Sequence, residues 1–124
     1  MATIAVVTGK TQEFNEKSIL HLWETLTTTN SDGAPVKLTG AYLCDVQVLG
    51  TFGIGGTVLI EGSLVESPGA SDWATLNDVQ GNALSFTAAK IEKVQEEVLW
   101  IRPRVSGGDG TTDLDVRLMQ TRRA

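Results

Sequence analysis

The stretch LWIRPRVSGGDGTTDLDVRL, from Leu99 to Leu118, decides how this chain is expected to fold. Two runs of alternating apolar and polar residues flank a loop rich in Ser, Gly, Asp and Thr, the pattern of a β-hairpin with a long polar turn. Apolar residues at every second position from Leu99 to Val105 share one face of the first run, and those from Leu114 to Leu118 share one face of the second. The sequence therefore predicts two strands with one face each in a core.

The polar residues of the two runs form a ladder if the strands pair. The apolar residues have odd numbers in the first run and even numbers in the second. If both apolar faces point into one core, the two residue numbers of each cross-strand pair must therefore add up to an odd number. Pairing Val105 with Thr112 meets this condition, and each resulting opposite-charge or cation–π pair contributes about 0.2–1 kcal/mol. The ladder then sets Arg104 against Asp113, Arg102 against Asp115 and Trp100 against Arg117. We interpret these residues as structural and not as a catalytic site.

Composition places the chain among ordinary globular domains. It has 124 residues, of which 41% are apolar and 20% charged, and its net charge is −5. Acidity argues against nucleic-acid binding, and the apolar runs fall short of the roughly 20 residues that a membrane span needs. We also expect no signal peptide at the N-terminus. A single cysteine, Cys44, excludes an internal disulfide, fits a reducing compartment and is expected to be a small buried hydrophobe.

Turn signals recur at short intervals along the whole chain, which contains thirteen glycines. This spacing predicts an all-β fold, a single antiparallel β-sandwich of jelly-roll or Greek-key type over residues 1–124. An extended N-terminal arm over 1–17 and a short basic tail over 120–124 are expected to flank it. We also expect at most one short helix near 88–97, with an irregular connection as the alternative. The expected strands are 4–7, 18–26, 36–38, 43–49, 57–64, 73–76, 83–86, 98–105 and 113–119.

Sites for phosphate, nucleophilic catalysis and zinc find little support. The segment around Gly9 lacks the earlier glycine of a phosphate-binding loop, because Ile4 stands there. The only histidine, His21, has no acidic neighbour to orient it except Glu24, and we expect it to face solvent or an oligomer interface. One histidine and one cysteine make a poor zinc site.

Carboxylates offer two further alternatives. Asp109, Asp113 and Asp115 follow two glycines, but their spacing does not match an EF-hand calcium loop. A glycosidase would need a pair of catalytic carboxylates. The spacing of the acidic residues in the sequence singles out no such pair among Asp72, Asp78, Glu92, Glu96 and Glu97. We therefore expect no enzyme activity, no metal, no cofactor and no small-molecule substrate.

From residue 50 onward the chain resembles small structural proteins of tailed bacteriophages, of the head decoration or cement type. The likeness is collective and covers a little over half of the chain. Its motifs are Gly50-Thr-Phe-Gly53, Val58-Leu-Ile-Glu-Gly-Ser63, Asp72-Trp-Ala-Thr-Leu-Asn-Asp78, Gly81-Asn-Ala-Leu-Ser-Phe-Thr-Ala88, Ile101-Arg-Pro-Arg-Val105 and Gly107-Gly-Asp-Gly-Thr-Thr112.

The resemblance implies a virion structural protein that is made in the host cytoplasm, binds the outside of the phage head and stabilises the shell. Its expected partners are the major capsid protein and further copies of itself, with a trimer favoured. Candidate contacts are Ile4 and Val6, as a strand added to a neighbouring sheet, Asp109 in the loop 106–112, and Arg122 and Arg123 on acidic capsid patches.

The alternative function is a carbohydrate- or receptor-binding β-sandwich module of a phage tail or surface protein. The run Glu61-Gly-Ser63, a turn and Trp73-Ala-Thr-Leu76 is also similar to ligand-binding sandwiches of the discoidin type. In such a module an exposed tryptophan ring would form the sugar platform, and the candidates are Trp23, Trp73 and Trp100.

Overall fold

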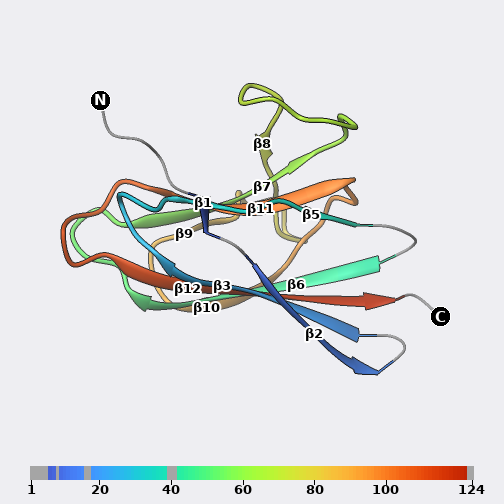
Figure 1. Ribbon diagram of the computed structural model, residues 1–124, viewed down its shortest axis with the longest axis horizontal. Coiled ribbons are helices and arrows are strands. Elements are labelled where there is room, and N and C mark those ends of the chain that lie inside the picture. The colour runs from blue at the N-terminus through green and yellow to red at the C-terminus, as the bar shows by residue number, and fades with distance from the viewer. Residues whose placement is uncertain (1–5, 8, 16–17, 39–41, 123–124) are drawn as a thin grey trace.

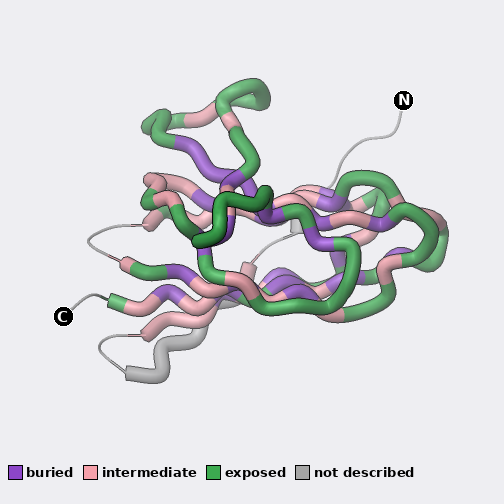
Figure 2. The backbone as a smooth tube through the Cα atoms, turned by 180° about the vertical axis from the view of Figure 1, so that it is seen from behind, coloured by how far each residue is buried: buried purple, intermediate pink, exposed green. Residues whose placement is uncertain are grey.

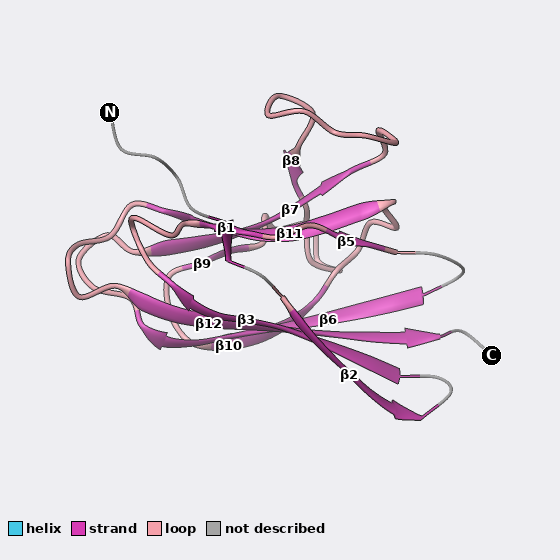
Figure 3. Ribbon diagram, in the orientation of Figure 1, coloured by secondary structure: helices cyan, strands magenta, loops and turns pink. Residues whose placement is uncertain are grey.

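The computed structural model describes residues 6–7, 9–15, 18–38 and 42–122, and it is a sandwich of two β-sheets (Figures 1 and 3). Sheet A has the order β1 (Val6–Val7), β4 (Asp32–Gly33), β11 (Trp100–Ser106), β7 (Thr57–Ser63) and β8 (Ala74–Thr75). Two further strands of sheet A are β5 (Val36–Lys37), which pairs with β11, and β9 (Ser85–Phe86), which pairs with β7. Sheet B has the order β10 (Lys90–Lys93), β6 (Tyr42–Thr51), β12 (Asp113–Arg122), β3 (Ser18–Leu26) and β2 (Lys10–Asn15). The expected all-β sandwich is confirmed.

Pairing is antiparallel throughout the two sheets, apart from the two-residue parallel pair of β1 and β4. Within the described part of the chain, no helix is long and apolar enough to span a membrane.

The last two strands do not form a hairpin with each other. Strand β11 pairs with β7 on one side and with β4 and β5 on the other, all in sheet A. Strand β12 lies between β3 and β6 in sheet B. The loop between them therefore crosses from one sheet to the other. Both apolar faces point into the core as predicted, but they meet across the sandwich, and the predicted register between the two strands is wrong.

The segment 88–97 contains a strand and no helix. Lys90–Lys93 form β10 along the free edge of β6, with Ile91 opposite Gln47. Val94 then turns inward, and its N–H donates to the carbonyl oxygen of Cys44 at 2.9 Å. A strand at this position pairs with the backbone N–H and C=O groups along the edge of β6, whereas a helix would leave those groups without these partners. Tertiary pairing therefore overrides the local helix propensity.

Much of the expected N-terminal arm and basic tail is built into the sheets. Val6 lies in β1, at the end of the strand order of sheet A, where it pairs with β4 of the same chain. Residues 10–15 form β2 along β3, and β12 extends to Arg122. Ile4 and Arg123 lie outside the described residues.

The buried residues lie on the strands of both sheets (Figure 2). The core is mostly aliphatic, with Trp23 as its largest buried side chain. His21 is buried in it too, and its Nε2 lies 2.7 Å from Oε1 of Gln120. The expectation that His21 faces solvent or an interface is therefore wrong, because the residue shares the inward face of β3 with Trp23. Cys44 is buried, as predicted.

A β-bulge at Thr25 decides which leucines of β3 reach the core. Thr25 has a φ of 62°, the left-handed region, and the register of β3 with β12 shifts at this point. The N–H of Thr25 donates to Oδ1 of Asp115 at 3.0 Å. Beyond the bulge Leu26 is fully buried, whereas Leu20 and Leu22 are on the outer face. Strict alternation along the strand would place all three leucines on one face.

Pro103 occupies the middle of the central strand β11. It packs against Gly33, the last residue of β4, next to the gap that separates β4 from β5. A Cβ on Gly33 would lie 2.6 Å from the proline ring and 2.9 Å from Trp23, so only glycine fits there. The missing N–H of Pro103 thus falls at a break in the neighbouring strands, where a sheet tolerates proline.

Candidate functional site

The arginines of β11 form a charged cluster with Glu61 on the outer face of sheet A. Arg102 lies directly opposite Glu61 in the register, and its Nε and one terminal nitrogen both lie 3.1 Å from Oε1 of Glu61. Nε of Arg104 lies 3.0 Å from Oε2 of the same carboxylate. Glu61 is therefore the acid that both arginines share, in place of Asp113 and Asp115.

Two tryptophans connect this cluster to a segment that projects from the sandwich, residues 64–73, here called the arm (Figure 1). The ring of Trp73 stacks on the guanidinium of Arg102, with 4.3 Å from Cζ to the ring centroid. Trp100 donates from Nε1 to the carbonyl oxygen of Glu66 at 3.0 Å, and Lys37 lies 5.8 Å from its ring centroid. The expected pairing of Trp100 with Arg117 is replaced by these contacts.

The arm presents apolar side chains to solvent in a defined geometry. Most of the arm is exposed (Figure 2). Leu64 is 75% exposed, and Val65 is also exposed. The turn behind them is closed by the N–H of Gly69, which donates to Oδ2 of Asp72 at 2.7 Å. At the base of the arm, a shallow hollow of about 280 Å³ is lined by Pro35, Glu66, Ser67, Pro68 and Trp100. Because an exposed apolar surface on an anchored loop is typical of a contact site, the arm is the strongest candidate for binding a partner.

Another exposed apolar side chain lies at one end of the sandwich. Ile54 is 84% exposed, and its N–H donates to Oδ2 of Asp109 at 2.9 Å. Oδ1 of Asp109 accepts from both the N–H and the hydroxyl of Thr111. These bonds lower the pKa of Asp109, with the hydroxyl of Thr111 as the largest cause. Asp109, predicted as a partner contact, therefore shapes the two loops that present Ile54.

The remaining ladder residues lie on the outer face of sheet B. Asp113 is exposed and opposite Thr51, Asp115 holds the bulge at Thr25, and Arg117 is exposed beside Gln47 and Leu22. Arg122, a predicted capsid contact, is exposed at the end of β12 opposite Tyr42. The structure thus separates the six ladder residues into two sets on opposite faces.

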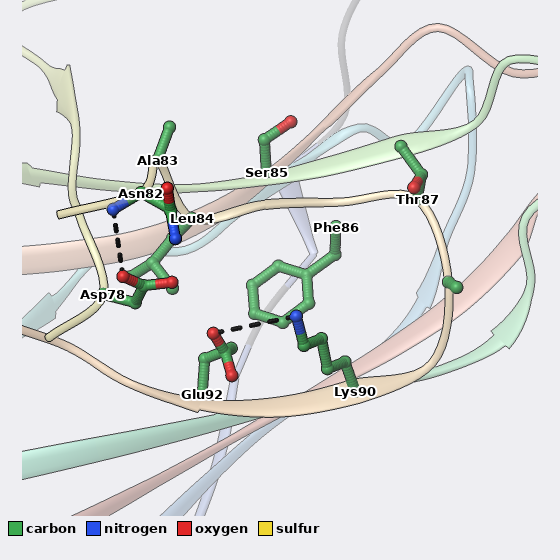
Figure 4. A pocket seen from close by; sticks show the side chains of 10 residues that line it. Asp78, Asn82, Ala83, Leu84, Ser85, Phe86, Thr87, Lys90 and Glu92 are labelled. Carbon is green, nitrogen blue, oxygen red and sulfur yellow. Dashed lines mark hydrogen bonds and ion pairs between the residues drawn. The ribbon is translucent and has the colours of Figure 1, made fainter. Parts of the chain in front are cut away.

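One cavity, of about 400 Å³, lies between the segment 78–88 and β10 (Figure 4). Asp78 and Glu92 both line it, with Phe86 and Lys90, and Lys90 lies 3.9 Å from Glu92. Oδ1 of Asp78 accepts from the backbone N–H groups of Asn82 and Gln80 at 3.0 and 2.9 Å, and the bond from Asn82 is the largest cause of the lowered pKa of Asp78. This carboxylate closes the turn over 78–82.

The other acidic candidates have structural partners. Glu96 accepts from the backbone and the side-chain amide of Asn77, both at 2.7 Å. Its burial opposes ionisation, but these hydrogen bonds leave its pKa lowered. Among the described residues, no three His, Cys, Asp or Glu side chains are close enough to hold a metal ion. The three tryptophans predicted as sugar platforms also have partners within the chain. Trp73 stacks on Arg102 and Trp100 donates to Glu66, as described above. Trp23 is buried and donates to the carbonyl oxygen of Ala34 at 2.9 Å.

Sequence reasoning missed Glu61 and the arm. Glu61 lay in an expected strand, but nothing local distinguished it from an ordinary solvent-facing acid, and the arm was expected to be a turn. A usable signal was present in Trp73 and Trp100, because two large rings near a Pro-containing turn suggest that the turn is packed down. A comparison with protein-family models, curated proteins and solved structures found no match to this chain.

Proposed function

We propose that this chain is a virion structural protein of the head decoration type, which binds the outside of a capsid through its arm and stabilises the shell. The observation that carries the proposal is the projecting arm, with Leu64 and Val65 exposed on a segment held by Trp73 and Trp100. The sequence resemblance to phage decoration proteins supplies the kind of partner, and the all-β sandwich is compatible with it.

Anchoring of the arm matters for binding energy. A flexible loop loses conformational entropy when it binds, at a cost of about 0.5–1.5 kcal/mol for each long side chain that becomes fixed. The stacking of Trp73 on Arg102 and the bond from Trp100 to Glu66 fix the arm before contact. Covering Leu64 then adds up to about 2 kcal/mol from apolar burial. A small rigid protein can gain useful affinity for a shell in this way without a catalytic step.

The direct test is binding of the purified chain to phage heads that lack it. The chain should co-sediment with the heads, with a copy number comparable to that of the major capsid protein, and raise the temperature at which the heads release DNA. Leu64→Asp should abolish binding, whereas Val79→Asp, a matched change at another exposed apolar position, should leave binding unchanged.

Two results would refute the proposal. One is that the purified chain fails to bind the heads under conditions where it is folded. The other is that Leu64→Asp and Val79→Asp bind as well as the wild type. Quenching of tryptophan fluorescence by a glycan, together with no binding to heads, would favour the carbohydrate-binding alternative.

A further inference from the structure

The outer face of sheet B is a mixed surface of aliphatic and charged side chains. Ile91, on β10, is 61% exposed. A shallow hollow of about 320 Å³ lies on this face, between Ile91, Leu20 and Met119 and the polar residues around them. The aliphatic side chains that point outward on this face are Leu20, Leu22, Leu43, Leu49, Ile91 and Met119.

Arg117 is the unusual residue of this face. It lies on β12, the middle strand of sheet B, with Gln47 opposite on one side and Leu22 on the other. Its side chain is exposed, and within the described part of the chain no hydrogen bond or ion pair holds its guanidinium. Its neighbours on this face include the aliphatic side chains of Leu22 and Met119. An arginine beside aliphatic side chains at the centre of a surface is typical of the residues that contribute most to protein interfaces.

The register places an acid where a second copy would need it. Met119 is opposite Asp45, and Arg117 is opposite Gln47, so these four residues occupy the corners of one rectangle on the face. Arg117 and Asp45 stand at opposite corners. A two-fold axis lying in the face along the line from Met119 to Gln47 exchanges those two corners. Arg117 of each copy then faces Asp45 of the other copy.

The same axis also matches the next pair of charges. Asp115 precedes Arg117 on the outer face of β12, and Lys93 lies beside Asp45 on β10, at 2.9 Å. These two positions lie on opposite sides of the axis at similar distances, so Asp115 of one copy approaches Lys93 of the other. Oδ1 of Asp115 remains bonded to the N–H of Thr25. Each of these charged groups thus meets a group of opposite sign.

We propose that the outer face of sheet B binds a second copy of this chain in a two-fold dimer, with Arg117 and Asp45 exchanged across the axis. Every contact from one residue to a second residue of the other copy is repeated in the opposite direction, which is the condition for a closed, isologous interface. Met119 lies on the axis and meets its own copy, and Ile91 meets the aliphatic region around Leu49. The strands of the two copies cross steeply, as in orthogonal sheet packing.

This dimer goes beyond the proposed capsid binding, since it uses the opposite face from the arm and needs no capsid. Sedimentation velocity and light scattering on the purified full-length chain, over a range of concentrations, test it directly. The wild type should change from monomer to dimer as concentration rises. Failure to bind heads would leave this result intact, so the two proposals are tested separately.

Charge reversal provides the specific test. Arg117→Asp should weaken dimerisation at least about tenfold, because it places two acids against each other twice in each dimer. Asp45→Arg should weaken it similarly, and the double variant Arg117→Asp with Asp45→Arg should recover much of the loss. Lys37→Asp, on sheet A, makes the same change in net charge and should leave the dimer unchanged. Melting curves of each variant verify that it is folded.

If Arg117→Asp does not fold, Ile91→Lys tests the same face at an exposed edge position and should also weaken the dimer. Several outcomes would overturn the proposal: a monomer at every concentration, a trimer, or a dimer that Arg117→Asp leaves unchanged. Binding of a different protein to this face, with the purified chain remaining a monomer, would overturn it as well.

Discussion

Replacing Glu61 by Gln tests the central structural finding, that one acid serves both arginines of β11. The Glu61 side chain is 7% exposed and that of Arg102 is 15% exposed, so their contact is largely shielded from water. Arg104 is 36% exposed and can turn toward solvent when the acid is lost, so its share is discounted. Breaking a buried ion pair by removing one partner typically costs 3–5 kcal/mol, because an uncompensated charge stays behind.

For Glu61→Gln we expect the low end of that range, about 3 kcal/mol, since the amide still accepts one hydrogen bond and Arg104 can be hydrated. In a domain of this size the loss corresponds to a fall in Tm of about 10 °C. Urea denaturation followed by tryptophan fluorescence gives the free energy of unfolding, and calorimetry gives the Tm.

Two companion variants make the measurement specific. Asp113→Asn changes the acid that a hairpin between β11 and β12 would place against Arg104, and we expect almost no effect because Asp113 is exposed on the other sheet. The double variant Glu61→Met with Arg102→Met removes both charges of the shielded pair and should be more stable than Glu61→Gln. A change in Tm below about 2 °C for Glu61→Gln, or an equal loss for Asp113→Asn, would refute the reasoning.

Three further outcomes follow from single residues. Thr25→Gly should raise the Tm by a few degrees, because it relieves a left-handed conformation that costs a β-branched residue about 1 kcal/mol or more, and a lower Tm would contradict this. Asp109→Asn should lower the urea midpoint at pH 7. Since the pKa of Asp109 is lowered by folding, its contribution is present above about pH 3.8 and decreases as the pH falls through the lowered value, so a difference between the two proteins that does not shrink as the pH falls below 3.8 would contradict the assignment. Burial, with a smaller effect of Asp45, raises the pKa of Cys44 to about 12. A thiol reagent at pH 8 should therefore label Cys44 only as the protein unfolds, and rapid labelling of the folded chain would refute its burial. The same shift means that the free energy of unfolding should fall as the pH rises above 9, where the thiol ionises in the unfolded chain.

Local pattern was enough to predict the fold class and most of the inward-facing residues. The strand 18–26 was predicted with the bounds that the structure has, and β6, β7, β11 and β12 each contain most of an expected strand. These predictions succeeded because alternation of apolar and polar residues depends only on the chain itself. The missed strand β2 has no such alternation, and it is ordered by the edge of β3.

Deviations from simple alternation required the three-dimensional structure. The bulge at Thr25 returns Leu26 to the core, and nothing in the letters Glu24-Thr25 predicts it. His21 and Gln120 are polar residues at inward positions, acceptable because each satisfies the other at 2.7 Å across two neighbouring strands. Their compatibility depends on the register between β3 and β12, which pairs residues almost a hundred positions apart.

The stretch from Leu99 to Leu118 shows where the boundary lies. By itself the sequence determined that two strands with one buried face each are joined by a polar loop, since side-chain alternation in a strand is a local property. Only the tertiary structure decided that the loop crosses between the sheets, so that Arg102 and Arg104 meet Glu61 while Asp115 and Arg117 lie on the opposite face. The physical reason is that alternation specifies which face is buried and leaves the neighbouring strand open, and the neighbour is chosen by packing of the whole chain.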